Sequence, residues 1–327
     1  MSDQEVTNQG QMDINSIPVE VLRRQADRAY QEYDYEKAVE IYTQALEING
    51  LDGPIRYELI KNRAECYERL GNEGLRARDL KNLSSIANGL SDDRRKIEAM
   101  YLLAVALKIN GKASKARELY AAAINRAEVL DDKKLIADCL TANDEIYDSP
   151  SKELSLRALQ LYQELDDKFG QFHAYSNLAN SYYFDGDLAL AMDWSQKGLI
   201  IAPELGDRFV EGWAYNLMAA CQTDLQLKRE FYERVLAICQ DIHTPMGLSL
   251  VYNNLGFYFF YKLGLYESAF EYARNAVQLA REMQNLQFLS INLEAESMAL
   301  SILSSCAVPD KPMYALKSAL STYCPAT

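Results

Sequence analysis

The chain has 327 residues, and its hydrophobic fraction of 49% is typical of a folded protein and argues against wholesale disorder. Its 47 acidic and 34 basic residues give a net charge of −13, which argues against nucleic acid and anionic membrane surfaces as partners, because both attract clustered Lys and Arg. With only 8 prolines and 15 glycines, the composition favours a mostly helical fold.

Residues 1–17 are polar and lack the apolar core of a signal peptide, so we expect them to form a disordered tail. No apolar run in the chain approaches the ~18 residues that a membrane span needs. The six cysteines form no CxxC element, and most lie among apolar helical residues, which favours free buried thiols in a reducing compartment. These features predict a cytoplasmic protein.

From residue 18 onward, apolar residues recur at three- and four-residue spacing, which predicts helices. The helices are expected in pairs, and the first pair is the clearest. Its second helix carries Ala38, Tyr42 and Ala45, where the small residues let two helices approach closely and the ring fills the gap between them. The small residue returns on a fixed stride, because Ala38, Ala77 and Ala116 are 39 residues apart.

The second half of the chain carries a more regular marker, an Asn-Leu pair that returns every 38 or 39 residues. A returning pair at a fixed stride indicates a repeat architecture. The pairs are Asn177-Leu178, Asn216-Leu217, Asn254-Leu255 and Asn292-Leu293. Together the two markers predict eight helix pairs, which begin near residues 19, 55, 93, 132, 168, 207, 246 and 286.

Acidic residues recur where one pair passes to the next. Paired carboxylates are compatible with a metal site or with acid/base chemistry, but their position just before helical runs favours N-caps, since Asp bonds the free N–H groups of a first turn. The residues concerned are Asp92, Asp93, Asp131, Asp132, Asp166, Asp167, Asp207 and Asp241. After residue 306, Pro309 and Pro312 interrupt the pattern, and a short amphipathic helix within 307–327 is expected to cap the last repeat. The alternative is that a further domain was once joined there.

Several stretches resemble the tetratricopeptide repeat (TPR) family, in its variety with a period of about 40 residues. They include Asn62-Arg63-Ala64 with Leu70-Gly71, Asn177-Leu178-Ala179 with Gly186-Asp187, and Asn254-Leu255-Gly256 with Tyr266. The resemblance covers 18–306 and is weak around 132–166 and 207–241. It implies an all-α fold, a right-handed α–α superhelix of about eight helix-turn-helix repeats, in which first helices line the concave side. Stacked pairs bury apolar faces that a single pair leaves open.

Evidence for catalysis is nearly absent from the sequence. His173 and His243 are 70 residues apart and lie in no metal-ligand spacing, and no Walker, GxGxxG or GxSxG loop occurs. We therefore expect no catalytic residue, no metal site and no cofactor, and the chain is predicted not to be an enzyme.

The Asn of each Asn-Leu pair lies about 100° around its helix from the Leu. Leu is therefore expected in the packed seam between helices, and Asn beside it on the concave groove. An amide offers an acceptor and two donors, so a series of them can pair with the backbone of an extended peptide. The resemblance implies this use, since bacterial peptide-pheromone receptors and kinesin light chains bind peptide backbones with similar asparagines. The alternative is that these amides bond a neighbouring helix.

Aromatic rings beside this series of asparagines, which we call the ladder, are candidates for contacts with the side chains of the peptide. Residues 252–261 carry six of them, and a helix that is aromatic all round cannot hide every ring in one seam. Phe259 is expected in the core, whereas Phe257, Phe260 or Tyr261 has a ring available for the groove. The predicted peptide-binding residues are His173, Asn177, Asn180, Tyr183, Asn216, Asn254, Phe257, Tyr261 and Asn292.

These features favour a non-catalytic scaffold for protein–protein interaction that binds an extended peptide or partner segment in its concave groove. One alternative is a peptide- or partner-responsive regulatory sensor that acts through another protein. Another is the recruiting region of a multidomain signalling or protease system. The expected partner is a protein or peptide, with no nucleic acid and no membrane, and the sequence defines neither its identity nor the oligomeric state.

Overall fold

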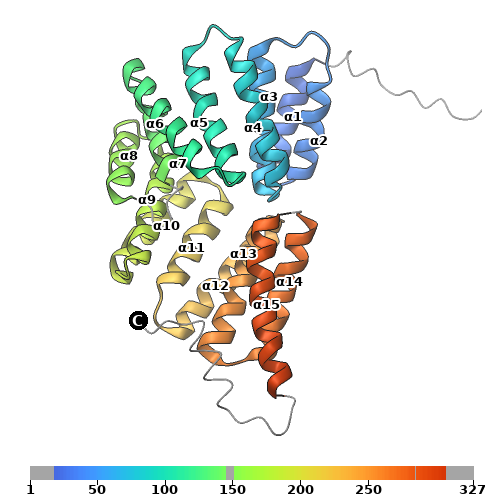
Figure 1. The fold of residues 1–327 in the computed structure, drawn as a ribbon, viewed down its shortest axis with the longest axis vertical. Helices are drawn as coiled ribbons and strands as arrows, with labels where there is room; N and C mark the ends of the chain where they lie inside the picture. Colours follow the sequence, from blue (N-terminus) through green and yellow to red (C-terminus); the bar gives the residue numbers. More distant parts are fainter. Residues whose placement is uncertain (1–17, 145–150, 284, 307–327) are drawn as a thin grey trace, which may run out of the picture.

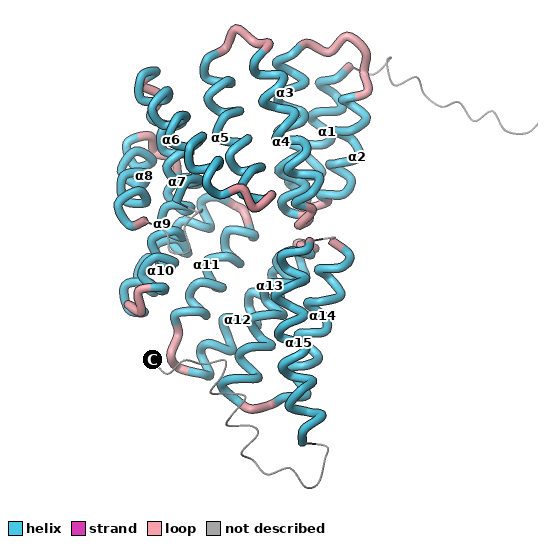
Figure 2. The backbone as a smooth tube through the Cα atoms, viewed as in Figure 1, coloured by secondary structure: helices cyan, strands magenta, loops and turns pink. Residues whose placement is uncertain are grey.

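A computed structural model describes residues 18–144, 151–283 and 285–306 of the chain. These residues form fifteen α-helices and one π-helical turn, and they include no strand (Figures 1 and 2). The elements are α1 (Val19–Gln31), α2 (Tyr35–Leu46), α3 (Gly53–Arg69), α4 (Glu73–Asn88), α5 (Asp93–Ile109), α6 (Ala113–Leu130), α7 (Lys133–Asp144), α8 (Lys152–Glu164), α9 (Lys168–Phe184), α10 (Leu188–Leu205), α11 (Arg208–Cys221), α12 (Leu225–Asp241), α13 (Pro245–Phe257), η2 (Tyr258–Leu263), α14 (Tyr266–Glu282) and α15 (Leu286–Cys306).

The helices form the expected pairs, and the all-α solenoid is confirmed. The odd-numbered helices are the first helices of the pairs, and each begins within two residues of its expected start. Seven pairs are complete, and α15 is the first helix of the eighth. The predicted tail at 1–17 and the predicted capping helix within 307–327 lie outside the described residues. No helix in the described ranges is both long and apolar enough to cross a membrane.

Small residues at the predicted positions bring the helices of a pair together. Ala38 and Ala45 are completely buried, and Tyr42 between them is 2% exposed. The same arrangement recurs in α6, where Ala116, Tyr120 and Ala123 are inaccessible to solvent. Because each pair buries its apolar face against the next, stability accumulates through contacts between neighbouring repeats.

Four of the eight acidic residues predicted as N-caps cap first helices, namely Asp92, Asp132, Asp167 and Asp207. The carboxylates of Asp92, Asp132 and Asp167 accept from backbone N–H groups three residues on, at 3.0, 2.9 and 2.9 Å. The other four do not cap: Asp93 is the first residue of α5, Asp131 and Asp166 have left-handed backbones between helices, and Asp241 ends α12 and pairs with Arg208. The cap of α13 is instead Thr244, whose hydroxyl accepts from the Gly247 N–H at 3.4 Å.

The π-helical turn η2 is a feature that the sequence does not predict. It carries Tyr258, Phe259 and Phe260, which are buried in succession, at 5%, 8% and 7% exposure. The three rings belong to one hydrophobic cluster with Val235 of α12 and Ala269 of α14, so neighbouring helices cover them from more than one side. The core position of Phe259 is confirmed, whereas Phe260, a candidate for the groove, is buried.

The stack of repeats curves until its two ends meet, so that α1–α4 lie next to the ends of α13, α14 and α15 (Figure 1). We call this meeting the closing contact. Its hydrogen bonds run from Arg208 N to Tyr33 Oη (3.0 Å), from Thr244 Oγ1 to Arg69 O (3.2 Å) and from Asn285 Nδ2 to Gly71 O (3.1 Å). They join turns that are 175 to 214 residues apart in the sequence.

The closing contact is a packed interface. The Arg69 guanidinium lies 3.9 Å from the centre of the Phe209 ring and 3.7 Å from the Asp207 carboxylate. Thr244 is fully buried, and Asn285 is 4% exposed. First helices from both ends of the stack therefore face a common interior, which we call the lumen.

Candidate functional site

A pocket of about 370 Å³ opens from the lumen. Five first helices contribute to it, namely α3, α9, α11, α13 and α15, and α12 lies beneath. Its lining residues are Glu68, Phe172, His173, Ser176, Asn177, Asn180, Phe209, Gly212, Trp213, Asn216, Val235, Ile238, Cys239, Ile242, Met246, Gly247, Leu250 and Phe288. We call it the lumen pocket. Its volume is at the lower end of the range of about 300–1,000 Å³ for ligand sites.

Four of the nine predicted site residues line the lumen pocket, namely His173, Asn177, Asn180 and Asn216. The structure thus brings together residues from the fifth and sixth repeats that the Asn-Leu stride had placed on equivalent positions. The His173 ring packs edge-on against Phe169, with 4.6 Å between ring centres. The apolar part of the lining comes mostly from residues that no motif marked.

The amides of the ladder also bond neighbouring helices, as the alternative interpretation expected. Asn177 Nδ2 donates to the Thr141 carbonyl of α7 at 3.4 Å, and Asn254 Nδ2 donates to Asn216 Oδ1 at 2.8 Å. Within the described chain, Asn180 makes no side-chain hydrogen bond. The ladder therefore holds adjacent first helices together while Asn177, Asn180 and Asn216 also line the pocket.

Asn292 does not face the groove, which corrects its assignment to the ladder. The residue is completely buried, and its Nδ2 donates to Ser249 Oγ and to the Ala276 carbonyl, each at 3.0 Å. Its partner in α13 is Asn253 rather than Asn254, at 2.8 Å. The register between α13 and α15 is thus shifted by one residue. As a result, the roles within the Asn292-Leu293 pair are exchanged, since Asn292 is buried and Leu293 is 38% exposed.

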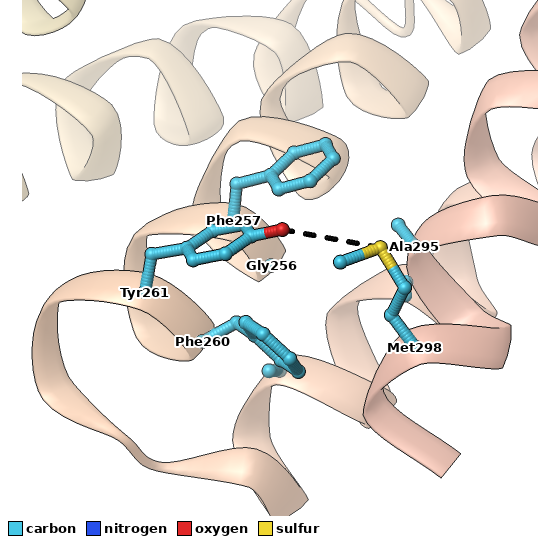
Figure 3. A pocket seen from close by; sticks show the side chains of 8 residues that line it. Gly256, Phe257, Phe260, Tyr261, Ala295 and Met298 are labelled. Carbon is cyan, nitrogen blue, oxygen red and sulfur yellow. Dashed lines mark hydrogen bonds between the residues drawn. The ribbon is translucent and has the colours of Figure 1, made fainter. Parts of the chain in front are cut away.

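The remaining predicted residues lie away from the lumen pocket. Phe257 and Tyr261 stack with 5.8 Å between ring centres, and Tyr261 Oη lies 3.9 Å from Met298 Sδ (Figure 3). The space between them is about 10 Å³, which is room for about one water molecule. Tyr183 is 40% exposed beside the more exposed Phe184. These rings and the lumen pocket are thus separate features.

Glu68 of α3 is the one carboxylate among the described residues that line the pocket. One turn earlier, the Glu65 side chain is exposed to solvent, yet the protein packed around it raises its pKa to about 7, against the opposing charge of Lys61. Glu68 is bound by Arg76 at 2.8 Å. Arg69 is engaged in the closing contact, and no Lys or Arg lines the pocket among the described residues. The site therefore suits an uncharged or cationic occupant better than an anion.

The pocket shows no arrangement for catalysis in the described part of the chain. No group of three His, Cys, Asp or Glu residues is placed to hold a metal ion there. Burial raises the pKa of the Cys239 thiol to about 12, so this thiol is protonated near neutral pH and is a poor nucleophile. The thiols of Cys66, Cys139 and Cys221 are buried and free, as the sequence predicted.

Solved structures share this architecture. The chain is similar to the Rap conjugation gene regulator of the plasmid pLS20 in complex with the Phr* peptide, with 16% identity, 87% and 81% of the two chains covered and a TM-score of 0.67. It is also similar to a STAND signal-transduction ATPase with a tetratricopeptide repeat sensor from Pyrococcus horikoshii, with 14% identity, 89% and 45% covered and a TM-score of 0.53. A third similar structure is aspartyl phosphate phosphatase F from Bacillus subtilis, with 15% identity, 89% and 81% covered and a TM-score of 0.53.

No protein-family profile and no curated protein sequence matches the chain. At these low identities, the similar structures establish the fold alone. The chain is a TPR-like repeat protein in its architecture, as its sequence predicted.

Proposed function

We propose that this chain is a non-catalytic scaffold for protein–protein interaction, which binds an extended peptide or a partner segment in its lumen. The observation that carries the proposal is the lumen pocket, where amides of successive first helices stand beside a deep apolar surface. Amides pair with a peptide backbone, and apolar walls accept its side chains. The partner is a protein or peptide, and neither nucleic acid nor a membrane is expected.

The similar structures support a peptide as the occupant. The pLS20 regulator carries its Phr* peptide on the same fold. The phosphatase shows that the architecture also occurs in a protein named as an enzyme, so fold alone does not decide the question. The proposal that this chain is not an enzyme rests on its own buried, protonated thiols and on the lack of a catalytic motif in its sequence.

Fluorescence anisotropy with a labelled peptide library tests the proposal. Asn180→Ala is the cleanest variant, because Asn180 lines the pocket and has no side-chain hydrogen bond to lose in the described structure. It is expected to weaken binding by about tenfold, because the free energy of one or two hydrogen bonds to the ligand corresponds to a change of that size in Kd. The control is Gln226→Ala, an exposed amide of α12 that bonds only Glu230. Equal binding by both variants contradicts the proposal.

A second candidate function is a sensor that responds to a peptide or partner and acts through another protein. The closing contact favours it, because Phe209, which stacks on Arg69 there, also lines the lumen pocket. A ligand that binds the closed ring better than an open one shifts the balance between them. Small-angle scattering of the protein with and without bound peptide decides this, and an unchanged radius of gyration counts against a sensor.

A further inference from the structure

The lumen pocket has a structural origin that defines what it binds. In the fifth and seventh repeats, the residue five positions before the N-cap of the first helix faces the residue three positions after that N-cap. In the fifth repeat these are Tyr162 and Gly170, and a Cβ added to Gly170 would lie 2.1 Å from the Tyr162 ring. The ring of Tyr162 thus occupies the space that the glycine leaves.

The two equivalent positions are complementary in size in the neighbouring repeats. One member is small and the other large, as close packing requires. The pairs are Ala127 with Leu135, Tyr162 with Gly170, Ala202 with Val210, and Ala280 with Phe288.

The seventh repeat breaks this rule, because both of its members are small. They are Cys239 and Gly247, and a Cβ on Gly247 would lie 2.6 Å from Thr244 Cγ2 and 2.7 Å from the Cys239 sulfur. Thr244 and Cys239 therefore fill the space directly over Gly247, and Cys239 stands at the repeat position that Tyr162 holds two repeats earlier. Cys239 and Gly247 both line the lumen pocket, and Gly247 is half-buried whereas Gly170 is buried. The lumen pocket therefore reaches both members of the pair in the seventh repeat, whereas neither Tyr162 nor Gly170 of the fifth repeat lines it.

The walls of the lumen pocket around this pair are apolar. Val235, Ile238, Ile242, Leu250 and Phe288 line it with aliphatic and aromatic side chains. On α11, Gly212 keeps the backbone close to Ile238, since a Cβ there would lie 3.2 Å from its Cγ2 atom. An engineered apolar cavity of about 150 Å³ accepts a benzene ring, so about 370 Å³ holds a bulky side chain together with part of its backbone.

We infer that the seventh repeat supplies a specificity pocket, which takes one bulky apolar side chain of Leu, Met or Phe size from an extended peptide. The side chain packs beside Cys239 and Gly247, at the repeat position where Tyr162 stands two repeats earlier. The peptide backbone then lies along Asn177, Asn180 and Asn216 at the mouth. This inference rests on the proposed peptide-binding function and adds the residue type that the peptide must carry.

Pools of N-acetylated, C-amidated heptapeptides test the inference. The central residue is fixed as Ala, Leu, Met, Phe, Lys or Glu, and the other positions are mixed. The Leu, Met and Phe pools are expected to bind at least about tenfold tighter than the Ala pool, as burial of a large apolar side chain implies. Equal binding by all pools overturns the specificity pocket and leaves the proposed function standing. If no pool binds, both the function and the inference fall.

Variants of the pocket complete the test. Cys239→Phe restores the large member of the facing pair and is expected to abolish the preference for Leu, Met and Phe, whereas Cys239→Ala keeps it. Leu250→Trp fills the pocket from α13, where Leu250 is only half-buried, so it reports even if Cys239→Phe fails to fold. The control is Leu227→Trp, at an exposed leucine of α12 outside the pocket. A preference that survives in folded Cys239→Phe or Leu250→Trp overturns the inference, as does binding of free toluene without any peptide preference.

Discussion

A buried ion pair joins the two helices of the second repeat. Arg63 binds Asp79 with two hydrogen bonds of 2.8 and 2.9 Å, and its third nitrogen donates to Thr43 Oγ1 at 3.0 Å. The Asp79 side chain is completely buried. Removal of one partner leaves the other charge buried without compensation, which is costlier than the loss of the pair as a whole.

We therefore expect Arg63→Leu to destabilise the protein by about 3–5 kcal/mol. The double variant Arg63→Leu with Asp79→Leu is expected to lose much less, because no charge is left in the core. Urea unfolding of the native protein and the three variants, including Asp79→Leu alone, gives the coupling. Additive losses in the double variant would mean that the buried charges do not interact.

Glu65 gives the lumen a pH dependence. Its pKa of about 7 in the folded chain lies above the ordinary value of 4.5, and the largest cause is the protein packed around it. The charges of Glu68 and Glu98 also raise the pKa, whereas those of Lys61 and Arg69 lower it. Between these pH values the folded chain holds a proton that the unfolded chain has released. Glu65 therefore lowers the stability progressively as the pH rises from about 4.5 through about 7.

Glu65→Gln removes this proton linkage. The variant is expected to be more stable than the native protein at about pH 8, and the advantage is expected to shrink as the pH falls to about 5. Thermal melting of both proteins over this range measures the difference. A difference in Tm that is independent of pH would show that the carboxyl titrates normally.

At the residue scale, the sequence predicted which side chains are buried better than which side chains face the ligand. Leu178 and Leu255 are in the seam because their 3.6-residue periodicity is a local property. The fate of Asn292 depends on a one-residue shift between α13 and α15, which no local pattern records. The small pair Cys239 and Gly247 is visible in the sequence, but only once the N-caps fix which positions face one another.

At the scale of elements, the N-caps explain why the helix starts were predictable. Asp167 caps α9 at the Gly170 N–H and also lies 3.1 Å from Lys134 Nζ. Burial opposes its charge, but these two contacts outweigh it and hold the pKa of Asp167 below its usual value. The stabilisation is therefore present above about pH 3.9, the usual Asp pKa, and is lost as the pH falls below it.

Asp167→Ala is expected to cost about 1 kcal/mol near neutral pH, and the cost is expected to fade in acid. Asp167→Asn separates the two contributions, because the amide oxygen still caps α9 but no longer attracts Lys134. Chemical denaturation at neutral and acidic pH measures both variants. If Asp167→Asn loses as much as Asp167→Ala, the ion pair rather than the cap carries the effect.

The π-turn η2 shows the limit of prediction for elements. The six aromatics of residues 252–261 predicted that a uniform helix would expose some rings. Three of the rings are buried, and Tyr252, Phe257 and Tyr261 stay partly exposed, as expected; the widened turn itself is what the pattern did not predict. A local widening of this kind depends on the helices packed around it, such as α12, where the Leu225 carbonyl accepts from Tyr258 Oη at 2.9 Å.

At the scale of the whole molecule, the repeats were predictable from the sequence, whereas the closure of their stack into a ring was not. Each repeat is specified by contacts within itself and with its neighbours, so a periodic sequence is enough to reveal it. The closing contact joins turns such as those at Gly71 and Asn285, which are 214 residues apart. Its geometry depends on small rotations that accumulate over seven repeats, and no motif encodes their sum.

Two glycines allow the closing contact to be tested with a matched control. Gly71 and Gly186 occupy equivalent turns within their pairs, and both have left-handed backbones, with φ of +72° and +81°. A side chain at either position costs similar backbone strain, of about 1–2 kcal/mol. Only at Gly71 does an added Cβ meet the other end of the chain, 2.5 Å from Met283 Sδ and 3.5 Å from Met246 Cβ.

Gly71→Leu is therefore expected to open the ring, whereas Gly186→Leu is expected to destabilise the protein by a similar backbone strain and to leave the ring closed. Small-angle scattering measures the opening as a larger radius of gyration for Gly71→Leu alone. Peptide binding is expected to weaken in the same variant, because Met246 and Phe288 reach the lumen pocket from the region of the closing contact. If both variants keep the native radius of gyration, Met283 yields to the new side chain and the closing contact tolerates bulk. If Gly71→Leu opens the ring but binds peptide as the native protein does, the pocket is independent of closure, and the sensor candidate loses its structural support.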